Sequence, residues 1–96
     1  RDEDANERIL GSEWFKAYPV PFISAFTVVI NPQQTARASL VLHNTAGQTV
    51  FVKYIDVQSG VYQRISFNNL SSLGSGIYWL TYNDGKNSKI LRLVKQ

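Results

Sequence analysis

Few side chains in this 96-residue sequence are of the kinds that carry out catalysis. His43 is the only histidine, and it precedes a turn with no acidic residue close to it in the sequence. A single histidine cannot form a histidine-based metal site, and without a neighbouring carboxylate it has no partner for acid–base chemistry. We therefore expect His43 to be structural or simply exposed.

Carboxylates are equally sparse after residue 15, where Asp56 and Asp84 are the only two. Asp56 ends a predicted strand and Asp84 lies in a predicted turn, so they do not supply the paired carboxylates of a glycosidase. The acidic residues near the N-terminus lack the spacing of a calcium loop. Gly74–Gly76 lacks the Lys-Ser or Lys-Thr pair and the helix of a phosphate loop. With no Cys present either, the sequence predicts no enzyme, no cofactor and no metal site.

Charge is divided unevenly along the chain, whose overall net charge is +3. Residues 1–15 carry five acidic and two basic residues, whereas residues 16–96 carry eight Lys or Arg and two Asp. The basic residues 86, 89, 92 and 95 alternate between the two faces of a strand, so they form no stripe for a nucleic-acid backbone. Apolar runs reach only three or four residues. We expect neither nucleic-acid binding nor a transmembrane segment.

From Trp14 onward, aromatic and β-branched residues come in short runs separated by turn-forming residues at a spacing typical of a sandwich or barrel. No segment has the apolar period of a helix. Seven strands are expected, over residues 14–18, 24–30, 36–43, 48–57, 61–67, 76–82 and 88–95. Because such strands must bury their apolar faces, we predict an all-β domain at residues 14–96, with two stacked antiparallel sheets. Residues 1–13 are predicted to be a polar linker or a short helical turn.

Period-2 alternation indicates which side of each strand is buried. Asn83–Gly85 between two runs predicts a hairpin, and Leu70 and Leu73 in the longer connection are expected to close one end of the sandwich. The predicted buried sets are Phe26, Val28 and Ile30 in one strand, and Val61, Ile65 and Phe67 in another.

Aromatic side chains suggest one possible binding function. In the run 76–82, Tyr78 and Tyr82 share one face and Trp79 lies on the other, so one of these sets faces outward or borders the core. Small sandwiches fill their cores with Trp and Tyr, and we therefore favour core packing. The alternative is a carbohydrate-binding or fibronectin-like accessory module, with a stacking platform drawn from Trp14, Tyr54, Tyr62, Tyr78, Trp79 and Tyr82.

Four motifs occur in a distinctive order along this chain. They are Tyr18-Pro-Val-Pro-Phe22, Asn44-Thr-Ala-Gly-Gln48, Leu70-Ser-Ser-Leu-Gly-Ser-Gly-Ile-Tyr78 and the basic-aliphatic end Lys89-Ile-Leu-Arg-Leu-Val-Lys-Gln96. Over about residues 18–96 this order resembles the type A C-terminal sorting domain of the type IX secretion system. Members of that family typically read Tyr-Pro-Asn-Pro at the first motif. Val20 replaces the Asn here, which removes a side chain suited to capping the turn.

The resemblance implies a seven-stranded immunoglobulin-like sandwich and a non-enzymatic role. Such domains are appended to a cargo, here expected before Arg1, and they cross the inner membrane with it and fold in the periplasm. The outer-membrane translocon then recognises them, and a sortase-like peptidase usually removes them while the cargo is attached to surface lipopolysaccharide. Cleavage would fall in or before residues 1–13, where a polar linker is accessible. The expected location is the periplasm in transit, then the cell surface or the extracellular space.

Carried over to this sequence, the resemblance assigns translocon recognition to eleven residues. The prolines and glycines among them also have a purely conformational explanation, and Tyr78 could be a packed core aromatic. The terminal strand differs, because an edge strand exposes unpaired backbone groups that suit capture by strand addition. The eleven residues are Pro19, Pro21, Gly47, Gly76, Tyr78, Leu91, Arg92, Leu93, Val94, Lys95 and Gln96.

Overall fold

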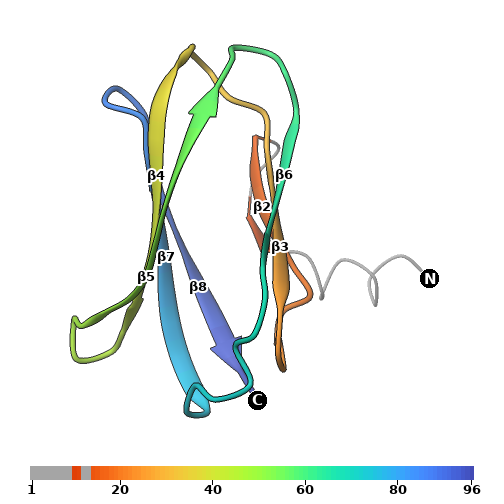
Figure 1. Ribbon diagram of the computed structural model, residues 1–96, viewed down its shortest axis with the longest axis vertical. Helices are drawn as coiled ribbons and strands as arrows, with labels where there is room; N and C mark the ends of the chain where they lie inside the picture. The colour runs from red at the N-terminus through yellow and green to blue at the C-terminus, as the bar shows by residue number, and fades with distance from the viewer. Residues whose placement is uncertain (1–9, 12–13) are drawn as a thin grey trace.

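A computed structural model describes residues 10–11 and 14–96, and every regular element in this part of the chain is a β-strand (Figure 1). The prediction of an all-β fold is confirmed, with seven longer strands and a two-residue strand before them. The strands are β1 (Leu10–Gly11), β2 (Phe15–Tyr18), β3 (Phe26–Ile30), β4 (Ala36–Asn44), β5 (Thr49–Val57), β6 (Gln63–Phe67), β7 (Gly76–Asn83) and β8 (Ser88–Lys95).

The strands form two antiparallel sheets of four. One has the order β1-β2-β3-β6 and the other the order β5-β4-β7-β8, and they face each other as two layers (Figure 1). β8 is therefore an edge strand, and β5 is the other edge of the same sheet. Most of the predicted linker lies outside the described residues, and its part at Leu10–Gly11 pairs with β2.

The core lies between the sheets and is built mainly from alternate residues of β2, β3, β4, β6, β7 and β8. Phe26, Val28 and Ile30 are buried as predicted, and so are Ile65 and Phe67 in β6. The expectation for residue 61 was wrong, because Val61 is 53% exposed. β6 begins only at residue 63, so Val61 belongs to the preceding loop and the strand alternation does not apply to it.

The β7–β8 hairpin is organised by a buried carboxylate. Asp84 accepts hydrogen bonds from the backbone N–H of Lys86 and Asn87, at 3.0 and 2.7 Å, and from the Tyr82 hydroxyl at 2.9 Å. Burial by itself raises the pKa of Asp84, but these hydrogen bonds outweigh it, so the pKa falls below its ordinary value. Burial, followed by the contact with Asp84, raises the pKa of Tyr82. Asp84 is thus a turn residue, as predicted.

The connection between β6 and β7 covers one end of the core. Leu70 is fully buried there and Leu73 packs against the core cluster, as the sequence predicted. The Leu70 N–H donates to the carbonyl of Ser24 at 2.8 Å, which ties this connection to the loop before β3.

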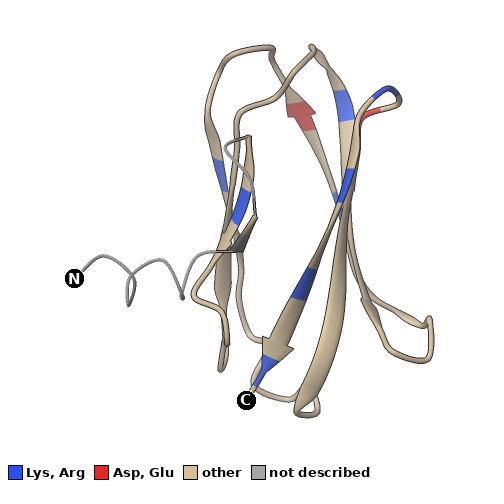
Figure 2. Cartoon of the chain, turned by 180° about the vertical axis from the view of Figure 1, so that it is seen from behind, with Lys and Arg blue, Asp and Glu red and all other residues tan. Residues whose placement is uncertain are grey.

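Basic residues are spread over both sheets rather than gathered in one stripe (Figure 2). In β8, Arg92 faces solvent whereas Lys95 is buried, which is the alternation that the spacing predicted. Among the described residues, no helix is long and apolar enough to cross a membrane.

Candidate recognition site at the C-terminal end

Among the described strands, the terminal strand β8 pairs with one neighbour. It pairs with β7 from Asn83 opposite Ser88 to Gly76 opposite Lys95. Leu91 and Leu93 point into the core and are buried, whereas Arg92 points outward. The strand that the resemblance assigns to recognition is therefore also part of the hydrophobic core.

The loop after β2 meets the last residues of the chain. The Phe22 N–H donates to the Val94 carbonyl at 2.9 Å, and the Gln96 N–H donates to the Phe22 carbonyl at 2.9 Å. Phe22 thereby forms a parallel bridge beside Lys95, on the edge of β8 that β7 leaves open. The first and last motifs of the sequence, about seventy residues apart, thus make one structural unit.

Phe22 is also the side chain that anchors this unit. It is fully buried, and its ring lies 5.0 Å from that of Phe26 and 6.4 Å from that of Tyr78, measured between centroids. Phe22 is not among the eleven residues predicted for recognition, although the two prolines of its motif are. Its position as the apolar residue that ends the motif was the available signal.

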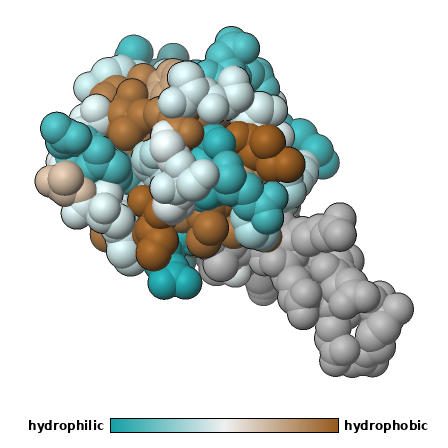
Figure 3. Space-filling view, turned by 90° about the horizontal axis from the view of Figure 1, so that it is seen from below, coloured by the Kyte–Doolittle hydropathy of each residue, from teal (hydrophilic) through white to brown (hydrophobic). Residues whose placement is uncertain are grey.

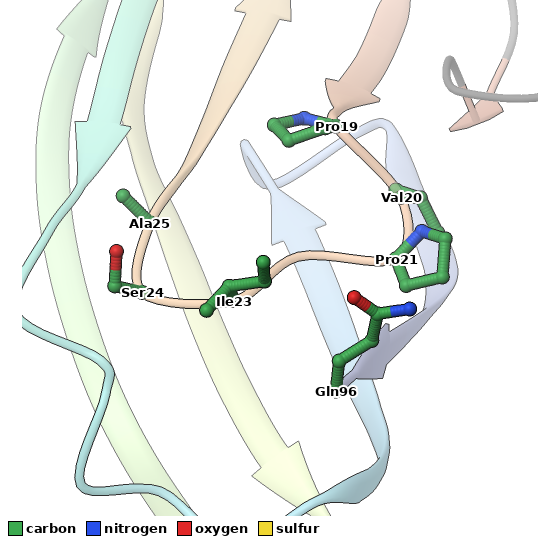
Figure 4. A pocket seen from close by; sticks show the side chains of 7 residues that line it. All are labelled: Pro19, Val20, Pro21, Ile23, Ser24, Ala25 and Gln96. Atoms are coloured by element: carbon green, nitrogen blue, oxygen red, sulfur yellow. The ribbon is translucent and has the colours of Figure 1, made fainter.

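Beside the chain terminus the loop leaves a hollow of about 530 Å³ (Figure 4). Pro19 and Pro21 are exposed there, and both follow cis peptide bonds. The side chain of Gln96 lies next to Pro21 (Figure 4). Val20 stands where the family typically has Asn, and it packs against the core cluster. Valine at this position therefore adds an apolar contact. The hollow is lined by Pro19, Val20, Pro21, Ile23, Ser24, Ala25 and Gln96.

Gly76 and Tyr78 belong to the same end of the molecule. Gly76 lies opposite Lys95 with φ of 142°, a conformation that residues with a Cβ rarely adopt. Tyr78 is buried, and its hydroxyl donates to the Gly74 carbonyl at 2.8 Å. Lys95 is also buried, with its ammonium 2.7 Å from the Gln96 carbonyl. Tyr78 and Lys95 therefore present little side-chain surface to a partner.

Gly47 lies in the turn between β4 and β5, which shares this end because Asn44 pairs opposite Tyr78. Gly47 has φ of 82°, and its N–H donates to the Asn44 carbonyl at 3.1 Å. It borders a different hollow, of about 420 Å³, together with Trp79. The structure therefore brings the prolines, Gly76, Tyr78 and residues 93–96 together and leaves Gly47 to one side.

The aromatic residues divide between core and surface. Tyr78 and Tyr82 are buried and Trp14 packs against the core, as expected. Trp79 is 39% exposed, in agreement with the expectation that one of the two sets in this strand faces outward or borders the core. The expectation of core packing was wrong for Tyr54 and Tyr62, which are 63% and 64% exposed. Trp79 points outward because it alternates with the two buried tyrosines of β7. On the end that carries the C-terminus, apolar surface is broken into separate patches by hydrophilic residues (Figure 3).

Groups that could hold a metal ion are not found among the described residues, where no three His, Cys, Asp or Glu side chains cluster. His43 is half-buried and pairs opposite Trp79 on β7. Asp56 is exposed and lies 3.7 Å from the guanidinium of Arg37, a weak surface ion pair.

Residues 16–96 match a protein-family model described as the secretion system C-terminal sorting domain. The chain belongs to this family of type IX sorting domains. The match takes in every motif of the sorting domain from the proline loop to the terminal strand. None of the curated proteins compared with the chain matches it.

Domains of this family are generally non-catalytic. A sorting domain interacts with the secretion machinery and with a cargo, and it implies export to the cell surface or the extracellular space.

Proposed function

We propose that this sorting domain is a non-catalytic signal that directs an attached N-terminal cargo through the type IX outer-membrane translocon. The cargo passes through the periplasm, a sortase-like peptidase cuts in or before residues 1–13, and the cargo is attached at the cell surface. The translocon recognises the end of the sandwich where the terminal strand meets the loop that carries Pro19 and Pro21, here called the proline loop.

One observation carries the placement of the recognition surface. Phe22 bonds to both Val94 and Gln96, so the exposed prolines and the chain terminus are presented as one surface. Gly76 and Tyr78 contact the residues of that surface: Gly76 pairs with Lys95, and the ring of Tyr78 packs against Phe22. Gly47 contributes through the neighbouring turn at the same end.

The proposal is tested by fusing residues 1–96 behind a periplasmic reporter in a host that has this secretion system. We expect the complete fusion at the cell surface and a fusion that lacks Leu91–Gln96 in the periplasm. Surface display of the shortened fusion at the level of the complete one would refute the proposal.

A control is needed because the deletion also removes two buried leucines and therefore affects folding. Leu40→Ala creates a cavity at a fully buried position in β4 and leaves the terminal strand intact. We expect this variant to be displayed better than the shortened fusion. Equal retention of both would show that export depends on folding alone, against recognition of the terminal strand.

A carbohydrate-binding function has less support. Polysaccharide stacking needs neighbouring coplanar rings, whereas Trp79, Tyr54 and Tyr62 are absent from the ring pairs that the described residues form. Tyr54 pairs with Ser39 and Trp79 with His43, so they lie in different rows of the sheet, on strands that β4 separates.

A further inference from the structure

The two sides of the sandwich, where the edge strands of the two sheets lie next to each other, differ in their contacts. Between β5 and β6, the ammonium of Lys53 donates to the Ser66 carbonyl at 3.0 Å, and the rings of Phe51 and Phe67 pack edge to face. Between β1 and β8 there is instead a hollow of about 430 Å³. It is lined by Gly11, Val20, Lys89, Ile90, Leu91, Arg92 and Val94.

The backbone of β8 is oriented toward this hollow. The Val94 carbonyl and the Gln96 N–H bond to Phe22, so the even-numbered residues turn their backbone groups away from β7. By the alternation of an antiparallel ladder, the N–H and C=O groups of Ile90 and Arg92 point the same way. Within the described part of the chain, β8 pairs only with β7 and with Phe22. An edge of this kind accepts an added strand, and Phe22 already occupies its last positions.

The side chains around this edge define what such a strand must carry. Leu91 faces the space between the sheets, so an apolar residue fits beside it, whereas Ile90 and Arg92 lie on the outer face. Lys89 and Arg92 border the same hollow, and neither forms an ion pair with another described residue. A positive charge on an edge strand deters the pairing of a purely apolar strand. An added strand that carries a carboxylate can instead form an ion pair with that charge.

We propose that this edge, at Lys89–Arg92, docks an extended segment of the secretion machinery in which apolar and carboxylate side chains alternate. This proposal rests on the sorting function described above and specifies the partner's chemistry. The added strand pairs with the backbone of Ile90 and Arg92. Its carboxylates lie on the outer face near Arg92, and its apolar residues lie on the inner face near Leu91.

The backbone part of the proposal is tested with Ile90→Pro in the reporter fusion. Proline at this position removes an N–H that points away from β7, so the β7–β8 ladder keeps its hydrogen bonds. Ser66→Pro is the matched control, because the Ser66 carbonyl also points out of its sheet, at the free edge of β6. We expect at least about a tenfold loss of surface display for Ile90→Pro and display near the parent level for Ser66→Pro.

The charge part is tested with Arg92→Glu against Lys86→Glu, which makes the same change in net charge at an exposed position in the hairpin turn. We expect about a tenfold loss of display for Arg92→Glu only. Equal display of the two variants would overturn the acidic partner. This comparison also decides the matter if Ile90→Pro does not fold.

A direct readout uses the purified chain and a synthetic heptapeptide of alternating Val and Glu. We expect slower hydrogen exchange of the Ile90 and Arg92 amides in its presence, and no change with a peptide of alternating Val and Lys. No slowing with either peptide, or equal slowing with both, would contradict the proposal.

The two levels of failure are distinguishable. If deletion of Leu91–Gln96 abolishes display while Ile90→Pro and Arg92→Glu are displayed like the parent, strand docking is wrong and the sorting function stands. If the deletion has no effect, the sorting function itself is wrong.

Discussion

Replacing Phe22 by alanine tests whether the proline loop and the terminal strand are one unit. The side chain is fully buried and contacts the rings of Phe26 and Tyr78, so the change leaves a cavity and removes two aromatic contacts. Core Phe→Ala changes cost about 3–5 kcal/mol. Domains of this kind have about 5–15 kcal/mol of stability in total, so about a fifth of it or more would be lost.

Two measurements separate the overall loss of stability from local opening at the chain terminus. Urea unfolding gives the loss in free energy, and hydrogen exchange by NMR reports the amides of Phe22 and Gln96, which donate the two hydrogen bonds of the unit. The matched control is Phe67→Ala, because Phe67 is also buried and contacts two rings, yet its strand β6 pairs with β3 in the sheet that does not contain β8.

We expect similar losses of stability in the two variants, with faster local exchange at Gln96 only in Phe22→Ala. A loss under about 1 kcal/mol for Phe22→Ala would contradict its role as the anchor, since that is far below the usual cost of such a cavity. Unchanged exchange at Gln96, despite the expected loss of stability, would contradict the link between loop and terminus.

Three further predictions concern single side chains. Asp84→Asn should cost about 1–3 kcal/mol at neutral pH, because a buried carboxylate loses hydrogen bonds. Since the folded pKa of Asp84 lies below its unfolded value, this difference should stay constant above about pH 4 and shrink as the pH falls further, in urea titrations at several pH values. Gly76→Ala should cost about 1–3 kcal/mol because its φ is 142°, whereas Gly74→Ala, where φ is not positive, should cost much less; thermal unfolding of both compares them. Trp79→Ala should lower the free energy of unfolding by less than about 1.5 kcal/mol, since the side chain is partly solvated, and a loss above about 3 kcal/mol would mean that it packs as a core residue.

Strand positions could be predicted from local patterns because each strand has one buried and one exposed face. The predicted run 88–95 coincides with β8, and the run 36–43 differs from β4 by one residue. The hairpin at Asp84 could also be predicted locally, because residues 83–85 are of the types that form tight turns. Val61 was misplaced because periodicity does not show where a strand begins, and β6 starts two residues later.

The candidate site was predictable as a list of residues but not as a surface. The order of the motifs was enough to name Pro19, Pro21 and the terminal strand. It did not show that Lys95 turns inward, nor that Phe22 links the loop to the terminus. Burial of a given side chain depends on which sheet covers its face, and that is a property of the packed layers.

The sequence by itself determined an all-β sandwich, because alternation and turn residues are local properties. Only the tertiary structure decided how its ends and edges are used. Hydrogen bonds between Phe22 and the terminal residues join segments far apart in the chain. Lys53 closes one side of the sandwich, while no described strand pairs with the edge of β8 at Ile90 and Arg92 that faces away from β7. These features depend on which strands become neighbours, and strand order arises from long-range pairing that the local pattern does not contain.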